Sequence, residues 1–355
     1  MDATTAAPSQ GPPPAQPVKL ILTVLMCCVV VGLLIWQRQR LAGLPRVLMH
    51  ANWGWILLAI AAQVVSIGTL AREQRRLISV RGGLRPMPAV LATTWAGNAI
   101  SISLPIVGSA TATVFVYYRF TAIGVDRALA AWALAISGIY STVSLATIAA
   151  AGAMISGSPG LAITGAATVL LGVIPVCLVL VGLRRPRVHA GASKVMAAGL
   201  RMMQRLFRRP SGNADQISRS TLDQLISLRV DVASGFVAGS MAFVNWILDL
   251  ACLTCAILAV HGTVPWSGLI LAWAAGCGAS SLGLTPGGLG VVEITLGAAL
   301  IAAGMPADLA IAAALLYRVI KLGLILAVGG MTLVILRITA SAPATASTLP
   351  TRSMS

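Results

Sequence analysis

The sequence predicts an all-α membrane protein that crosses the bilayer several times. Of its 355 residues, 57% are hydrophobic and only 10% are charged, and the mean hydropathy is +0.90. A water-soluble domain of this length would have too few charges to cover so much apolar side chain. Several apolar runs approach or exceed the roughly 18 to 20 residues that span a bilayer. They lack the alternation of a transmembrane β-barrel, which excludes that class.

About eight apolar segments follow one another along the chain. They lie at residues 18–36, 52–70, 89–118, 128–155, 161–183, 232–260, 265–303 and 306–336. No convincing cleavage site follows the first segment, so we expect an uncleaved span. The segments divide the chain into a disordered Pro-rich tail, a first membrane half, a basic segment, a second membrane half and a disordered tail, at residues 1–17, 18–183, 184–231, 232–338 and 339–355.

The formal net charge of +16 indicates either a nucleic-acid partner or contact with anionic lipid. In a membrane protein the lipid interpretation is favoured, because Arg and Lys stay on the cytoplasmic side, and we expect no nucleic-acid partner. The stretch "SKVMAAGLRMMQRLFRRP", within residues 184–231, has the pattern of a basic amphipathic helix on a membrane surface. A solvated loop helix is the alternative.

The positive-inside rule then gives an orientation. With residues 184–231 in the cytoplasm, the Arg-bearing segments 71–88 and 119–127 also lie there. The Arg-bearing loop 37–51 falls outside, against the rule. We expect a multi-pass protein of the cell membrane with both termini in the cytoplasm.

The cysteine and histidine residues give no sign of a metal or a redox cofactor. Cys252 and Cys255 have redox-motif spacing, but they lie inside a predicted membrane helix, where packing as small apolar residues is the favoured interpretation. The three His are scattered at predicted loops and helix ends. We therefore expect no metal site and no cofactor.

Two of the apolar segments are interrupted by helix-breaking residues. Segment 89–118 is broken near Pro105, and segment 265–303 is broken at Pro286. Because each begins and ends on one side in the predicted orientation, we expect two helical hairpins that enter from opposite faces. The similar stretches "AIGVDRALAAWAL" and "AAGMPADLAIAAAL" follow the two breaks at nearly equal spacing. This pairing predicts an inverted repeat, an arrangement that places a transport site near the midplane.

The second break, "LTPGGLGVVE", places non-helical backbone at membrane depth, where it is tolerated if protein buries it or if it lines a wet cavity. Pro286 ends one helix, and Gly287, Gly288 and Gly290 permit the turn. The helix that restarts beyond them directs free N–H groups at the break, which suits a phosphate or a carboxylate. Glu293 either acts in this site or only caps the helix and pairs with a cation.

Three further charged residues lie at membrane depth, where charge is costly and usually marks function. Arg318 and Lys321 share one face of the last predicted helix, and Asp249 lies in the middle of another. Glu293 with Arg318 and Asp249 with Lys321 are compatible partners, although the sequence does not choose between pairings. Purely structural ion pairs between helices are the alternative. The cluster is expected to be completed by Tyr317 and Asn245.

Residues 279–322 resemble the signature of the lysylphosphatidylglycerol synthase transmembrane family. Its P-G-G-x-G-x-x-E stretch and the Tyr-Arg pair that follows are matched by Pro286, Gly287, Gly288, Gly290, Glu293, Tyr317 and Arg318. Residues 95–120 resemble the family's other hairpin, through Asn98, Pro105 and Gly108. The family commonly carries an Arg and an acidic residue after that Pro, and residues 106–110 contain neither. The resemblance covers nearly the whole chain apart from its tails.

The resemblance implies a lipid-flipping membrane module, which in the best-known members is joined to a soluble aminoacyltransferase domain. Since the chain stops at residue 355, we expect a stand-alone module without that enzyme activity. We expect it to move the headgroup of an anionic phospholipid or of a lipid-linked glycan. The residues expected to bind the headgroup are Asn98, Pro105, Asn245, Asp249, Pro286, Gly287, Gly288, Gly290, Glu293, Tyr317, Arg318 and Lys321.

Two other classes of function stay open at this stage. One is a non-catalytic subunit that partners a lipid- or glycan-modifying membrane enzyme; a homodimer is also compatible with the small-residue helix faces. The other is an intramembrane enzyme with Asp249 or Glu293 as its base, which is less favoured because no His or metal set accompanies them. The sequence has no P-loop, so a gradient, a partner or equilibrium scrambling would drive any transport.

Overall fold

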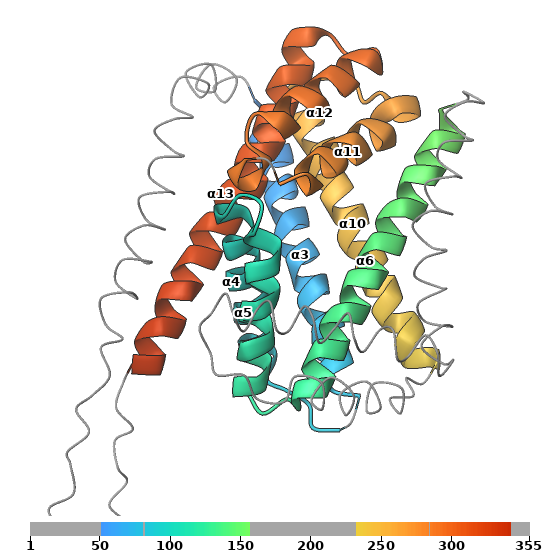
Figure 1. Ribbon diagram of the computed structural model, residues 1–355. Coiled ribbons are helices and arrows are strands. Elements are labelled where there is room, and N and C mark those ends of the chain that lie inside the picture. Colours follow the sequence, from blue (N-terminus) through green and yellow to red (C-terminus); the bar gives the residue numbers. More distant parts are fainter. Residues whose placement is uncertain (1–50, 81, 157–231, 284, 342–355) are drawn as a thin grey trace, which may run out of the picture. The chain divides into compact units, whose positions relative to one another are not determined.

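The computed structural model describes residues 51–80, 82–156, 232–283 and 285–341 (Figure 1). Every regular element within these residues is helical, which confirms the all-α prediction. The elements are α3 (Trp53–Ile78), α4 (Met87–Ser103), α5 (Gly108–Ala122), α6 (Arg127–Ile155), α10 (Val232–Ala259), α11 (Trp266–Ser281), the 3-10 helix η1 (Pro286–Gly288), α12 (Val291–Ala302) and α13 (Ala307–Ser341). The predictions for both tails, two of the spans, most of the loop at 37–51 and the basic amphipathic helix lie outside the described residues.

Four of these helices are long and apolar enough to cross a membrane. Their apolar parts cover Trp53–Ile78, Arg127–Ile155, Ala233–Ala259 and Ala307–Leu336. Large apolar side chains on them are exposed, such as Leu57 (64%) and Phe236 (77%). A water-soluble protein rarely exposes so many, but a surface that faces lipid requires them.

Local sequence explains where several of these helices begin. Asn52 caps α3 by accepting a hydrogen bond from Gly54 N at 3.0 Å, and Asp126 caps α6 by accepting one from Ala128 N at 3.3 Å. Helix α13 begins directly after Pro306, where the missing N–H of proline does no harm.

Helix α3 is longer than the apolar run that predicted it. The run ends at residue 70, whereas the helix continues to Ile78 and carries Arg72, Glu73, Arg75 and Arg76. Residues 71–78 were predicted only to lie in the cytoplasm, and the structure adds that they are helical. The physical reason is that loss of hydropathy marks the edge of the membrane, and a helix can continue beyond that edge with Arg and Glu, which are good helix formers.

The described helices pack around two hydrophobic clusters that share α3. The first cluster joins the beginning of α3 to α10, α11, α12 and α13, with Leu253, Ile257 and Trp273 fully buried. The second joins the end of α3 to α4, α5 and α6 around Phe120 and Leu77. Helix α10 packs most extensively against α3 (Figure 1). The hydroxyl of Ser66 donates to Asn245 Oδ1 at 2.9 Å across this contact.

Two helix pairs, α4–α5 and α11–α12, do not cross the bundle but turn back within it. The α4–α5 pair opens toward the end where α3 finishes, and the α11–α12 pair opens toward the end where α3 begins (Figure 1). The first tip is Leu104–Val107, and the second comprises residues 282, 283 and 285–290. The two tips touch, because Ile106 N donates a hydrogen bond of 2.9 Å to Gly283 O.

Candidate functional site

The chain turns sharply between α11 and α12, at the second hairpin tip. Pro286–Gly288 forms η1, and Gly287, Gly288 and Gly290 have φ angles of 60°, 70° and 84°. These angles lie in the left-handed region that favours glycine. At Gly288 an added Cβ would lie 2.7 Å from a methyl carbon of Val292. The backbone thus requires the glycines of this motif, and the interruption predicted from the sequence is present.

Glu293 and Arg318 fasten this tip to α13. Glu293 Oε2 accepts a hydrogen bond of 2.6 Å from Gly290 N at the start of α12. Its Oε1 accepts one of 3.1 Å from Arg318 Nε, and both side chains are buried. Arg318 Nη2 also donates to the carbonyl oxygen of Gly287. Helix capping and ion pairing, the two structural alternatives for Glu293, therefore both occur.

A second ion pair joins α10 to α13. Lys321 Nζ lies 2.7 Å from Asp249 Oδ1. Asp249 Oδ2 also accepts hydrogen bonds from the Tyr317 hydroxyl at 2.9 Å and from Trp273 Nε1 at 3.0 Å. The Asp249 side chain is 4% exposed, whereas that of Lys321 is 23% exposed. Of the four charged side chains in the two pairs, that of Lys321 is thus the most exposed.

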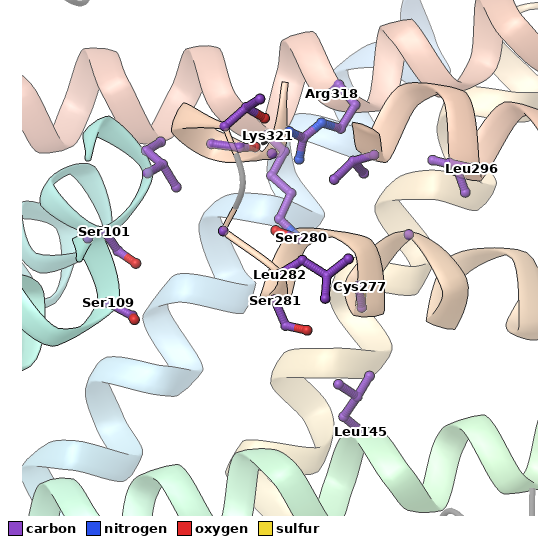
Figure 2. Close-up of a pocket in the computed structure, with 18 of the residues that line it drawn as sticks. Ser101, Ser109, Leu145, Cys277, Ser280, Ser281, Leu282, Leu296, Arg318 and Lys321 are labelled. Atoms are coloured by element: carbon purple, nitrogen blue, oxygen red, sulfur yellow. Dashed lines mark hydrogen bonds between the residues drawn. The ribbon is translucent and has the colours of Figure 1, made fainter. Parts of the chain in front are cut away.

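A cavity of about 590 Å³ lies between the two hairpin tips, and we call it the hairpin cavity (Figure 2). The first tip contributes Leu104 and Ile106, and the second contributes Gly287 and Gly288. Helix α13 contributes Tyr317, Arg318 and Lys321. Figure 2 shows the side chain of Lys321 reaching from α13 toward Ser280 on α11. Two segments far apart in the sequence therefore line one cavity, which has both polar and apolar residues.

Hydroxyl groups supply most of the remaining polar lining of the hairpin cavity. They belong to Ser101, Ser109, Ser141, Thr142, Ser280, Ser281 and Thr285. In Figure 2, Ser101 and Ser109 lie across the cavity from Ser280 and Ser281. A cation binds a phosphate oxygen strongly, and hydroxyls both donate to and accept from neutral polar groups. The lining suits a phosphate that carries glycerol or sugar hydroxyls.

The twelve residues predicted as a site take different places in the structure. Gly287, Gly288, Tyr317, Arg318 and Lys321 line the hairpin cavity. A supporting group holds those residues or the tips in place and comprises Asp249, Pro286, Gly290, Glu293 and Pro105.

Asn98 and Asn245 are not brought to the hairpin cavity. Asn98 Nδ2 donates to Thr94 O at 2.9 Å within α4. Asn245 accepts from Ser66 and joins α10 to α3, so it lies outside the Asp249 cluster that it was expected to complete. Tyr317 does join that cluster, as described above.

Sequence reasoning missed the cavity hydroxyls, because serine in membrane helices is most often a small packing residue. A short distance in sequence from the two breaks is the signal that could have found most of them, but not Ser141 and Thr142, which lie on α6. It also missed Glu73, which is completely buried in α3. Neither of its carboxyl oxygens makes a well-formed hydrogen bond with a described residue, although the Ser137 hydroxyl lies close by.

The sequence model of the family described as "Lysylphosphatidylglycerol synthase TM region" matches residues 19–329. The chain belongs to this family. A search among curated proteins finds no match. In this family member the P-G-G-x-G-x-x-E motif forms the second hairpin tip, and the Tyr-Arg pair lies on the wall of the hairpin cavity.

Proposed function

We propose that this member of the lysylphosphatidylglycerol synthase transmembrane family moves the headgroup of an anionic lipid, either a phospholipid or a lipid-linked glycan, across the membrane. The hairpin cavity is the observation that carries this proposal. It places two cations and several hydroxyls between two broken helix pairs that enter from opposite ends. Broken helices at matching positions of two halves are typical of midplane transport sites, so we also propose that the two pairs form an inverted repeat.

In the proposed mechanism Lys321 is the first cation to meet the phosphate. Its side chain is the most exposed of the four paired charges, and its ammonium contacts both carboxylate oxygens of Asp249, at 2.7 and 2.9 Å, and the Tyr317 hydroxyl at 3.0 Å. A phosphate that enters from the side of Ser280 would replace one of these three contacts, while Lys321 keeps the other two. Asp249 keeps its hydrogen bonds from Tyr317 and Trp273 throughout, so it does not become an isolated buried charge.

Arg318 has a different role in this mechanism, because it already serves the second tip. Its guanidinium donates to Glu293 and to the Gly287 carbonyl, which holds η1 against α13. Arg318 therefore adds positive potential to the wall of the hairpin cavity and keeps the tip in shape, while Lys321 supplies the direct contact. Rocking of the first tip away from the second would break the single backbone bond between Ile106 and Gly283 and let the headgroup pass.

The experiment that tests the proposal is transbilayer movement of fluorescent phospholipids in proteoliposomes. Wild type is compared with the double variant Lys321→Met/Asp249→Asn, which removes both charges of one pair and keeps an acceptor for Tyr317 and Trp273. Arg127→Gln, an exposed residue at the start of α6, is the control. We expect movement of phosphatidylglycerol in wild type and in the control, and its loss in the folded double variant.

Two results would separate this proposal from the partner-subunit alternative. Absence of movement for phospholipids and for a polyprenyl-phosphate sugar, with folded protein, would contradict the proposal. Equal movement in wild type and in the double variant would contradict the assignment of the site to the hairpin cavity. A partner subunit would instead show altered assembly in the variant and no lipid movement in any form.

A further inference from the structure

A second cavity, of about 540 Å³, lies at the end of α3 and shares no lining residue with the hairpin cavity. We call it the arginine cavity. Arg72, Arg75 and Arg76 line it from α3. Spacings of three and four residues place these side chains on one face of the helix. Three guanidinium groups thus face one hollow, at the end of the bundle that the positive-inside rule assigns to the cytoplasm.

The three arginines carry positive charge that no carboxylate of the described residues neutralises. Neither of the ion pairs present in the described part of the chain, Glu293–Arg318 and Asp249–Lys321, involves them. Glu73 lies between them in sequence, but it is completely buried while Arg72 and Arg76 are exposed. Arg75 is held in place, since its Nε donates to Arg85 O at 2.8 Å. Clustered like charges are unfavourable unless an anion joins them.

The lining of the arginine cavity is both polar and apolar. Ser79 and Ser234 belong to it besides the arginines, and the buried Ser79 Oγ has no hydrogen-bond partner among the described residues. Met87 of α4 and Met241 of α10 are among its apolar residues. Methionine is flexible and polarizable, so a lining of this kind adapts to a hydrocarbon chain. A free inorganic anion would use only the polar residues.

We propose that the arginine cavity binds an anionic phospholipid, with the phosphate on Arg72 and Arg76 and an acyl chain along Met87 and Met241. Arginine suits this role because its planar fork contacts two phosphate oxygens at once. The site holds a lipid at the opposite end of the bundle from the opening of the α11–α12 pair. The assignment concerns binding only, and it stands whether or not the hairpin cavity transports lipid.

The test measures binding of dioctanoyl phosphatidic acid to the purified full-length protein in detergent, by native mass spectrometry. Dioctanoyl phosphatidylcholine and inorganic phosphate are the comparison ligands. Arg72→Gln and Arg76→Gln are compared with Arg127→Gln, which removes the same charge from an exposed position outside the cavity. Arg72→Lys keeps the charge and removes the planar fork.

We expect each glutamine variant in the cavity to bind phosphatidic acid at least tenfold more weakly than wild type. Arg127→Gln should stay within twofold of wild type, and Arg72→Lys should fall between them. Equal losses in Arg127→Gln and Arg72→Gln would overturn the proposal, because they would show general attraction to a basic surface. Unchanged binding in both cavity variants would overturn it as well. If inorganic phosphate displaced the lipid at equal concentration, that result would contradict the claim that the apolar residues contribute to binding.

Discussion

The two hairpin tips are built in opposite ways. The second tip is tied to α13 by the buried Glu293–Arg318 pair and by the bond from Arg318 to Gly287 O. The first tip, Leu104–Val107, contains no charged residue, and Ile106 is 79% exposed with a φ of 58°. That φ is unusual for a β-branched residue, so the first tip carries backbone strain as well as few contacts.

In the mechanism proposed above, this difference indicates which part would move when a headgroup passes. Below its tip, the α4–α5 pair is well packed, since an added Cβ at Gly329 of α13 would lie 2.5 Å from Trp95 O of α4. Only the tip itself is held weakly, through one hydrogen bond to Gly283. We infer that the second tip is the fixed wall of the hairpin cavity and that the first tip is its moving part. Segments with few buried contacts open most readily.

The largest expected effect comes from removing the ion pair that holds the second tip against α13. Arg318→Met leaves the Glu293 carboxylate buried without its cation and removes the bond to Gly287 O. Removing one partner of a buried pair destabilises a protein by about 3–5 kcal/mol, so we expect a large drop in the thermal unfolding temperature in detergent. The double variant Glu293→Gln/Arg318→Met should recover much of the loss, because a buried pair can be replaced as a unit. A single variant as stable as wild type would show that the pair does not fasten the tip.

A smaller effect is expected where the first tip meets α5. An added Cβ at Gly108 would lie 2.2 Å from Ser101 O, a backbone atom that cannot rotate away. Gly108→Ala should therefore destabilise by about 1–3 kcal/mol, as overpacking does. Gly138→Ala in α6 is the matched control, since no atom lies within 4 Å of its added Cβ. We expect that control to be neutral or to stabilise by up to about 1 kcal/mol, because alanine favours helix. Thermal unfolding of both variants measures these changes, and a Gly138→Ala variant that is less stable than Gly108→Ala would contradict the expectation.

The smallest effect is expected at Glu73, the buried acid that belongs to neither hairpin. A variant at Glu73 shows what a buried carboxyl alone contributes to stability, because this residue holds neither tip in place. No described cation pairs with it, so Glu73→Gln removes no ion pair. Unfolding free energies in denaturant should change by less than about 1 kcal/mol. A loss as large as that of Arg318→Met would mean that Glu73 has a charged partner of its own.

The sequence was sufficient to predict the helical membrane class, the two interruptions and the charged residues near the second one. Proline and glycine act through local backbone geometry, and charge at membrane depth is rare, so both are visible in one sequence. The choice of partners was not predictable, because Asp249 and Lys321 are 72 residues apart and only packing brings them together. The end of α3 was not predictable from its apolar run, since hydropathy reports the membrane and not the helix.

The residues that line the hairpin cavity were likewise not predictable from the sequence alone. Ser101 and Ser280 are ordinary small residues in the sequence, and they line one cavity only because the two tips meet. Asn98, near the first break, and Asn245, predicted to complete the charged cluster, looked more promising, yet each is used by its own helix or its neighbour. A polar residue at membrane depth first satisfies its own hydrogen bonds, and only position decides whether it faces a cavity.

The central claim is that the first tip must part from the second for a lipid headgroup to pass. The most direct test places cysteines at Ile106 and Gly283 in a protein without its six native cysteines, and joins them with a short reducible cross-linker. A cross-link between cysteines at Asn52 and Ala259 is the control, because those residues share a 2.9 Å backbone bond between α3 and α10, far from the tips in sequence. Phosphatidylglycerol movement in proteoliposomes should fall at least tenfold when the tips are joined, and return on reduction, while the control cross-link leaves it unchanged. Movement at the wild-type rate with the tips verifiably joined would contradict the claim.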